Sequence, residues 1–355
     1  MPNKGVLLCF TSAVLAGYAA HALGVPLAWV LGPLVVTAAF AIGGIIPFAP
    51  LAGRRVGQVV IGAAIGLNVT PAVVVSLIGW LPMMVFTALL SMLVGSACAI
   101  ALARFGRVDM KTAYFCMMPG GLSEMSNIGA AHGAQNEPIA LSQAVRVALV
   151  VCILPPALVA LGLEGAFHER AVAHDLSWKI LPLVVLCGLV GALGAKLLHF
   201  NNPWMIGSLM GVGLLAAFSF AEGRMPRPLF YAGQFLLGIA IGARFRREVV
   251  MKLGRFVLVS SSLVLLMAGG MLLYALLLAD LADIDIATAA LSASPGGFAE
   301  MAVTAEVLHL NVTMVTAFHV IRALLVNGFT TYYFIFLERI GFFRFGSKLL
   351  GKRPR

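Results

Sequence analysis

A seven-residue segment that combines a helix breaker with a carboxylate occurs twice in this chain, each time inside otherwise apolar sequence. It reads Pro-Gly-Gly-Leu-Ser-Glu-Met at 119–125 and Pro-Gly-Gly-Phe-Ala-Glu-Met at 295–301, a separation of 176 residues. The match continues without a gap to an arginine, Arg146 in one copy and Arg322 in the other. Helix breakers and charges are costly in lipid, so each of these residues is a candidate for function.

The composition is that of a helical membrane protein. Of the 355 residues, 61% are hydrophobic and 11% are charged, whereas a soluble domain carries about 25% charged residues. Apolar runs of about 20 residues recur, which favours an all-α polytopic membrane protein over a β-barrel. The net charge of +10 comes from short basic clusters between the apolar runs. Such clusters indicate cytoplasmic loops and not a nucleic-acid surface.

The apolar runs predict two series of helices, each with one Pro-Gly-Gly segment. The first series has its segment at about 109–132 and a linker from 71 to about 82, with helices at 5–23, 27–45, 54–68, 83–103 and 138–161. The second has its segment at 285–309, with helices at 179–199, 203–220, 229–243, 255–279 and 313–337.

Two further motifs support an internal duplication. Gly57-Gln58 matches Gly233-Gln234 at the same offset, and Trp29-x2-Gly32 matches Trp204-x2-Gly207 at an offset of 175. The following glycines have the spacing that lets helix backbones approach closely, so we expect a packing role for Gly62, Gly66, Gly238 and Gly242. The sequence therefore predicts a first repeat at 1–168, a second repeat at 169–345 and a basic tail at 346–355.

Loop charge predicts the orientation of the helices. The loops at 104–111 and 244–255 and the tail are basic, so we expect all three in the cytoplasm, together with both termini. The acidic connection at 280–285 then lies outside, and a Pro-Gly-Gly segment that dips in and returns leaves the tail inside. Each half has about five spans plus one broken or re-entrant helix, and this odd number inverts the second half relative to the first.

The helix breaks are the predicted binding site. Proline removes a backbone donor and glycine allows close approach of a ligand, so Pro119, Gly120 and Gly121, with Pro295, Gly296 and Gly297, are expected to expose backbone groups near the midplane. The half-helix that follows favours anions at its N-terminus. A simple kink is the alternative reading.

The charged residues have two readings each. Glu124 and Glu300 could carry a proton or coordinate Na⁺, or each could cap its half-helix. Arg146 and Arg322 could attract an anionic substrate, or each could pair permanently with a glutamate.

The two halves differ in polar residues near the motif. Ser126 and Asn127 are candidate ion ligands in the first half only. His319 lies three residues before Arg322 and could share its helix face, or could be a satisfied interior histidine. The symmetric pair Gln58 and Gln234 is expected to form interhelical hydrogen bonds.

These motifs together resemble the AbrB-type duplicated membrane proteins of bacteria, over nearly the whole chain. Members of that family are labelled as ammonia monooxygenases or as regulators of gene expression. The Pro-Gly-Gly region is more distantly similar to the cation–proton antiporter and anion transporter group. That similarity implies transport, with broken helices that cross the membrane and each other.

The combined reading is a secondary transporter of a small anionic solute, coupled to H⁺ or Na⁺, in the inner membrane. The alternative is a membrane-embedded regulator that acts indirectly on gene expression. An enzyme ranks third, because the seven histidines and five cysteines have no ligand spacing and no dinucleotide motif occurs. We expect no cofactor and no nucleic acid; the expected partners are lipid, the solute, the coupling ion and a second copy of the chain.

Overall fold

The structure is a computed structural model that describes residues 4–69, 71–163, 165, 176–200, 202–221 and 223–349. These residues form helices and no β-strand. Within this part of the chain, five helices are long and apolar enough to cross a membrane: α1 (Lys4–Ala22), α4 (Pro71–Phe105), α7 (Asn136–Ala160), α12 (Gly254–Ala282) and α15 (Val312–Arg339). The prediction of a helical membrane protein is confirmed.

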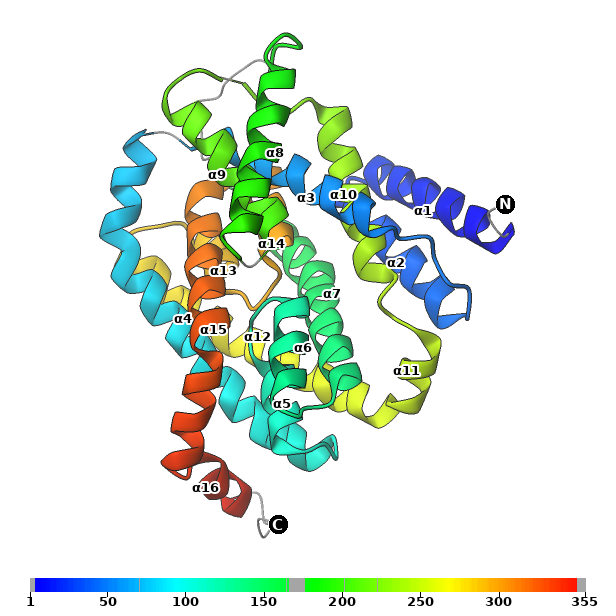
Figure 1. Ribbon diagram of the computed structural model, residues 1–355, viewed down its shortest axis with the longest axis vertical. Helices are drawn as coiled ribbons and strands as arrows, with labels where there is room; N and C mark the ends of the chain where they lie inside the picture. The colour runs from blue at the N-terminus through cyan, green and yellow to red at the C-terminus, as the bar shows by residue number, and fades with distance from the viewer. Residues whose placement is uncertain are drawn as a thin grey trace.

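Six helices form one side of the molecule, which we call the panel. It consists of α1 and five shorter helices: α2 (Ala28–Ile42), α3 (Leu51–Gly66), α8 (Leu181–Leu197), α9 (Pro203–Ala217) and α10 (Arg227–Gly242). Successive contacts run α1–α2–α10–α3–α9–α8, so α3 and α10 lie side by side at the centre (Figure 1). Helices from the two halves of the sequence therefore alternate at the middle of the panel.

Glycines bring the panel helices together. A Cβ added to Gly62 of α3 would lie 2.5 Å from the carbonyl oxygen of Met205 in α9. A Cβ on Gly238 of α10 would lie equally close, 2.5 Å, to the carbonyl oxygen of Val30 in α2. Gly66 and Gly242, one turn further on, face neighbouring backbone in the same way. Any side chain at these positions would push the helices apart.

The other side of the molecule, which we call the core, contains two short helical hairpins. The first hairpin consists of α5 (Met110–Met117) and α6 (Leu122–Ala131), and the second of α13 (Ile286–Ala293) and α14 (Phe298–Val307). The first hairpin lies against α7 and the second against α15, while α4 and α12 pack beside them (Figure 1). Each hairpin turns at its Pro-Gly-Gly segment.

Hydrogen bonds close both hairpins at their open ends. The amide N–H of Gln135, just before α7, donates to Thr112 Oγ1 in the first turn of α5, at 2.9 Å. The amide N–H of Asn311 donates to Thr288 Oγ1 in the same way, at 3.3 Å. The chain thus leaves each hairpin where it entered, which agrees with the re-entrant reading. Within the part of the chain that the structure describes, the Pro-Gly-Gly segments form hairpins and not the crossing helices that the distant resemblance implies.

Three details differ from the sequence predictions. The expected linker at 71–82 is helical, because α4 continues through Pro82; a membrane helix tolerates proline where the freed carbonyl finds another partner. Two unpredicted helices are α11 (Arg247–Lys252) and α16 (Phe342–Leu349). Part of the predicted tail thus belongs to α16, since Phe343 is anchored against Tyr114 and Phe334. The boundary at 168 and residues 350–355 lie outside the described residues.

Candidate functional site

A cavity of about 130 Å³ lies where the tips of both hairpins face α3, α9 and α10 of the panel. Both Pro-Gly-Gly turns contribute to its lining, through Pro119 to Gly121 on one side and Gly296 to Gly297 on the other. Its polar and charged residues are Arg54, Gln58, Glu124, Arg146, Asn202, Arg244, Glu300, His319, Arg322 and Asn327. The two motifs that are 176 residues apart in the sequence therefore share one site.

The backbone at both tips is extended. In the first hairpin, Met118 has φ −63° and ψ 129°, and Gly121 has φ −69° and ψ 142°. Ser294 and Gly297 have matching angles in the second. Helices α6 and α14 therefore begin at the cavity, and their first N–H groups have no intrahelical partner. One of these N–H groups has a partner in the second half of the chain: the Gly121 N–H donates to Asn327 Oδ1 at 3.4 Å.

The spacing of the motif follows from close contacts inside each tip. A Cβ on Gly121 would lie 2.1 Å from Glu124 Oε2, and a Cβ on Gly297 would lie 2.0 Å from Glu300 Oε2. Only glycine therefore leaves room for the carboxylate to fold back over the start of its half-helix. The first glycine of each pair makes room in the same way for a methionine side chain, that of Met125 or Met301.

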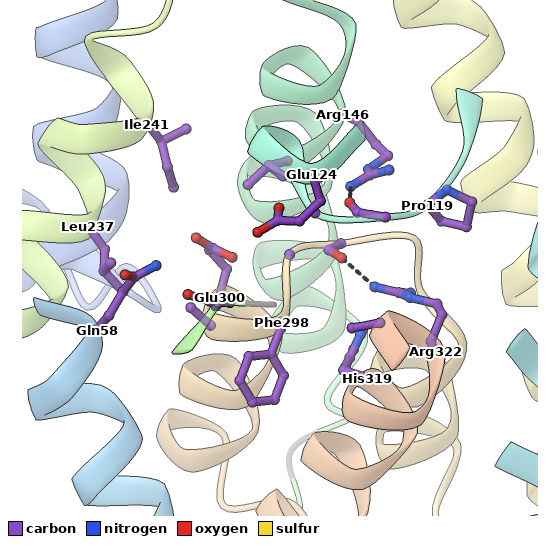
Figure 2. A pocket seen from close by; sticks show the side chains of 18 of the residues that line it. Gln58, Pro119, Glu124, Arg146, Leu237, Ile241, Phe298, Glu300, His319 and Arg322 are labelled. Carbon is purple, nitrogen blue, oxygen red and sulfur yellow. Dashed lines mark hydrogen bonds between the residues drawn. The ribbon is translucent and has the colours of Figure 1, made fainter. Parts of the chain in front are cut away.

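The two carboxylates point into the same space. Figure 2 shows Glu124 and Glu300 between the hairpin tips and the panel residues Gln58, Leu237 and Ile241. Glu300 is buried and Glu124 is half-buried. Folding back places each carboxylate at the N-terminal turn of its half-helix, where a negative charge is favourable. The same carboxylates also face the cavity, so stabilisation of the helix start and ligand binding are compatible here.

Arg146 and Arg322 hold the turns from behind. Arg146 donates from Nη1 to the Met118 carbonyl at 2.8 Å and from Nη2 to the Gly120 carbonyl at 2.9 Å. Arg322 donates to the carbonyl of Ser294 and, at 2.7 Å, to that of Gly296. Figure 2 shows the side chain of Arg322 pointing toward the turn. Both guanidinium groups are buried and occupy the C-terminal end of the first half-helix, where a cation is favourable. Among the described residues, neither arginine forms an ion pair with a glutamate.

Gln143 and His319 occupy equivalent positions and bind equivalent carbonyls. Gln143 Nε2 donates to the carbonyls of Phe115 and Met118, both at 2.9 Å. The Nε2 of His319 lies 3.0 Å from the carbonyl oxygen of Leu291 and donates to it. The His319 Nδ1 is buried and has no partner in the described part of the chain. Both side chains thus support the ends of α5 and α13.

Other predicted residues lie elsewhere. Ser126 is buried and Asn127 is exposed, and neither belongs to the cavity lining. Gln58 lines the cavity, but Gln234 is buried away from it. Pro295 precedes the part of its turn that faces the cavity. In the described residues, no group of three His, Cys, Asp or Glu side chains is arranged to hold a metal ion.

Five polar residues that line the cavity were not predicted as site residues: Arg54, Gln58, Asn202, Arg244 and Asn327. Charge at the edge of an apolar run is typical of a cytoplasmic loop, and both Arg54 and Arg244 stand at such an edge. Asn327 could have been found, since it is an amide inside the apolar run 313–337, five residues after Arg322. Asn202 is the N-cap residue of α9 and has a positive φ of 52°, a conformation that asparagine tolerates better than most residues. No pattern in the sequence places this residue at a site.

Known proteins resemble this chain over most of its length. A family model described as transition state regulatory protein AbrB matches residues 29–338. The uncharacterised protein YhjN of Bacillus subtilis (strain 168) is 28% identical over 340 residues, which cover 87% of each chain. A protein of Escherichia coli (strain K12), named there as a proposed regulator AbrB, is 24% identical over 335 residues, 91% of this chain and 93% of its own. The chain belongs to the AbrB family.

Proposed function

We propose that this protein is a secondary active transporter of a small anionic solute, coupled to H⁺ or Na⁺. The observation that carries the proposal is the convergence of two interrupted helical hairpins, one from each half of the chain, on one charged cavity. Secondary transporters bind substrate near the bilayer midplane, at the interface of their repeats, where helices are discontinuous. The free N–H groups at the start of α6 and α14 favour an anion there.

The contacts support two repeats related by a pseudo-twofold axis. The pair α1–α2 corresponds to α8–α9, and α2–α10 corresponds to α9–α3. In the core, α7–α12 corresponds to α15–α4. The axis would pass between α3 and α10 and between α4 and α12. In each of these pairs, one helix is the repeat equivalent of the other. An inverted relation follows if the hairpins open at opposite ends of the molecule.

Basic residues support such an orientation. The end that holds the opening of the first hairpin is tied together by Arg255 Nε donating to the Phe105 carbonyl at 3.1 Å, and by Lys252 lying 3.6 Å from Glu137. Helix α12 starts at this end, and the second hairpin follows its far end. The positive-inside rule places the basic end in the cytoplasm. We therefore propose an inner-membrane protein with both termini cytoplasmic and with hairpins that enter from opposite faces.

Glu124 and Glu300 are the proposed carriers of the coupling ion. Both face the cavity that would receive the solute, and Glu300 is 8% exposed. A carboxylate so close to a solute site can take up a proton or a Na⁺ ion together with the solute and release both after the conformational change.

Proteoliposomes test this proposal. Purified protein is reconstituted and exposed to a set of small labelled carboxylates under an imposed proton or Na⁺ gradient. We expect gradient-driven accumulation of at least one of them. The variants Glu124→Gln and Glu300→Gln should lose accumulation, while counterflow exchange persists. If no carboxylate accumulates under either gradient, the proposal of coupled transport is wrong. If the double variant accumulates solute as well as the unaltered protein, the proposed role of the two glutamates is wrong.

A second candidate is a membrane-embedded regulator that acts indirectly on gene expression. It is favoured by the description of the family and by the name of the Escherichia coli relative. The two roles are compatible, because a transporter changes the concentration of a solute to which gene expression can respond. A deletion strain in which the transport-defective Glu300→Gln variant restores normal expression would favour regulation without transport.

A further inference from the structure

Two arginines on the panel side of the cavity have no assigned role. Arg54 lies in the first turn of α3, and Arg244 follows the end of α10. Both side chains are half-buried and line the cavity opposite the hairpin tips. Within the described residues, neither guanidinium group forms a hydrogen bond or an ion pair, whereas Arg146 and Arg322 each donate from both Nη atoms to backbone carbonyls.

The position of Arg54 is unfavourable for its own helix. The N-terminal turn of a helix carries a partial positive charge, so a cation there is destabilised. Arg244 is near enough to be repelled by Arg54, while Glu300 and Glu124 attract it from across the cavity. Two like charges that share a partly desolvated cavity without partners cost free energy. The two glutamates supply two negative charges against the four arginines that line the cavity, so positive charge remains uncompensated and an anionic ligand is the natural partner of the pair.

The charge and the size of the cavity define that ligand. Four arginines and two glutamates line it, so its formal charge is +2 when both carboxylates are ionised. The volume of about 130 Å³ is close to that of an engineered cavity of about 150 Å³ that holds benzene, a ligand of six carbon atoms. A guanidinium group presents a planar pair of donors that matches the two oxygens of a carboxylate.

We infer that Arg54 and Arg244 form a clamp for a small dicarboxylate, each guanidinium group binding a carboxylate of the ligand from the panel side. This inference rests on the proposed function for its biological meaning, since the clamp would receive the transported solute. The hairpin tips, with the free N–H groups of α6 and α14, would face the same ligand from the core side.

Calorimetric binding to the full-length protein in lipid nanodiscs tests the clamp without any transport. The probes are malonate, acetate and inorganic phosphate, each as the sodium salt at constant ionic strength. We expect malonate to bind more tightly than acetate or phosphate. Because hydrogen bonds to a charged group are stronger than those between neutral groups, Arg54→Gln or Arg244→Gln should weaken malonate binding by about 10- to 100-fold.

Two further sets of variants make the result specific. Arg246→Gln removes the same charge from an exposed residue two positions beyond Arg244 and should leave malonate binding unchanged. Arg54→Lys and Arg244→Lys keep the charge but lose the paired donors, so they should fold normally and still bind malonate more weakly. Thermal unfolding without ligand checks that each variant is folded.

Several results would overturn the clamp. The first is that malonate does not bind the unaltered protein. The second is that phosphate or acetate binds more tightly than malonate. The third is that the folded Arg54→Gln/Arg244→Gln variant binds malonate as tightly as the unaltered protein. Failure of the proposed function gives a different pattern: malonate then binds in an arginine-dependent manner but does not accumulate in proteoliposomes.

Discussion

At the scale of single residues, each Pro-Gly-Gly motif is explained by contacts within its own tip. The second glycine leaves space for the carboxylate of the glutamate three positions later, and the first leaves space for the methionine five positions later. The motif is thus a compact structural unit. It presents a carboxylate to the cavity at a fixed distance from the start of a half-helix.

This contact predicts a specific coupling between Gly297 and Glu300. The substitution Gly297→Ala should lower the free energy of unfolding by about 1–3 kcal/mol, because the new methyl group collides with the Glu300 carboxylate. In a Glu300→Ala background, the same substitution should cost much less, since the obstacle is gone. Thermal unfolding of the four purified proteins completes the double-mutant cycle. Additive effects of the two substitutions would show that the contact is unimportant.

The arginines behind the turns give a second residue-scale prediction. Arg146→Gln leaves the Gly120 carbonyl without its donor and removes one donor from the Met118 carbonyl, which keeps the Gln143 side chain. An unsatisfied buried group costs about 1–3 kcal/mol. We expect a clearly less stable protein. Since Arg146 holds carbonyls and not a glutamate, adding Glu124→Gln should not restore stability. Recovery in the double variant, measured by thermal unfolding, would instead indicate a glutamate–arginine ion pair.

The sequence indicated which of these residues matter but not what each contacts. Glu124, Glu300, Arg146 and Arg322 stand out because charges are rare in apolar runs. Their partners could not be inferred, since the arginines bind backbone carbonyls, which every residue possesses. Arg54 and Arg244 do not stand out in this way, because both lie at the ends of apolar runs. Charge at the end of an apolar run usually marks a loop, and only the three-dimensional arrangement turns these two toward the cavity.

At the scale of helices and hairpins, the re-entrant reading followed from loop charge alone. A local sequence pattern also indicates the hairpins. Asp109-x2-Thr112 and Asp285-x2-Thr288 occur at the same offset of 176. Each aspartate caps its helix, through the N–H of Thr112 at 2.9 Å and of Thr288 at 2.7 Å. Each threonine then accepts the N–H that closes the hairpin. The prediction of a linker at 71–82 is wrong, because α4 continues through Pro82, and a membrane helix tolerates an internal proline.

The close helix packing of the panel is testable with matched glycine substitutions. Gly62→Ala and Gly238→Ala should each destabilise the protein by about 1–3 kcal/mol, because the added methyl group meets a neighbouring carbonyl oxygen. Gly269→Ala in α12 is the control, since a Cβ there has no neighbour within 4 Å. It should be neutral or slightly stabilising, because alanine is the better helix former. Equal unfolding temperatures for all three variants would contradict the packing described here.

At the scale of the whole molecule, the proposed duplication would relate the helix contacts of the first half to those of the second, in both the panel and the core. What the sequence could not provide is how the helices divide between these two parts. The alternation of α2, α10, α3 and α9 depends on pairwise packing of glycine faces, and many pairings of such faces are sterically acceptable. The shared cavity is a consequence of that division, because it lies between the two parts.

The central claim is that two hairpins enter from opposite faces and meet at one site. It is tested by single cysteines, placed in a cysteine-free protein at the exposed residues that flank each hairpin: Arg107 and Asn136 for the first, Asp283 and His309 for the second. Intact cells and inverted vesicles are treated with a membrane-impermeant maleimide. We predict that positions 107 and 136 react only from the cytoplasmic face, and positions 283 and 309 only from the other. Labelling of the two flanks of one hairpin from different faces, or of all four positions from the same face, would contradict the account.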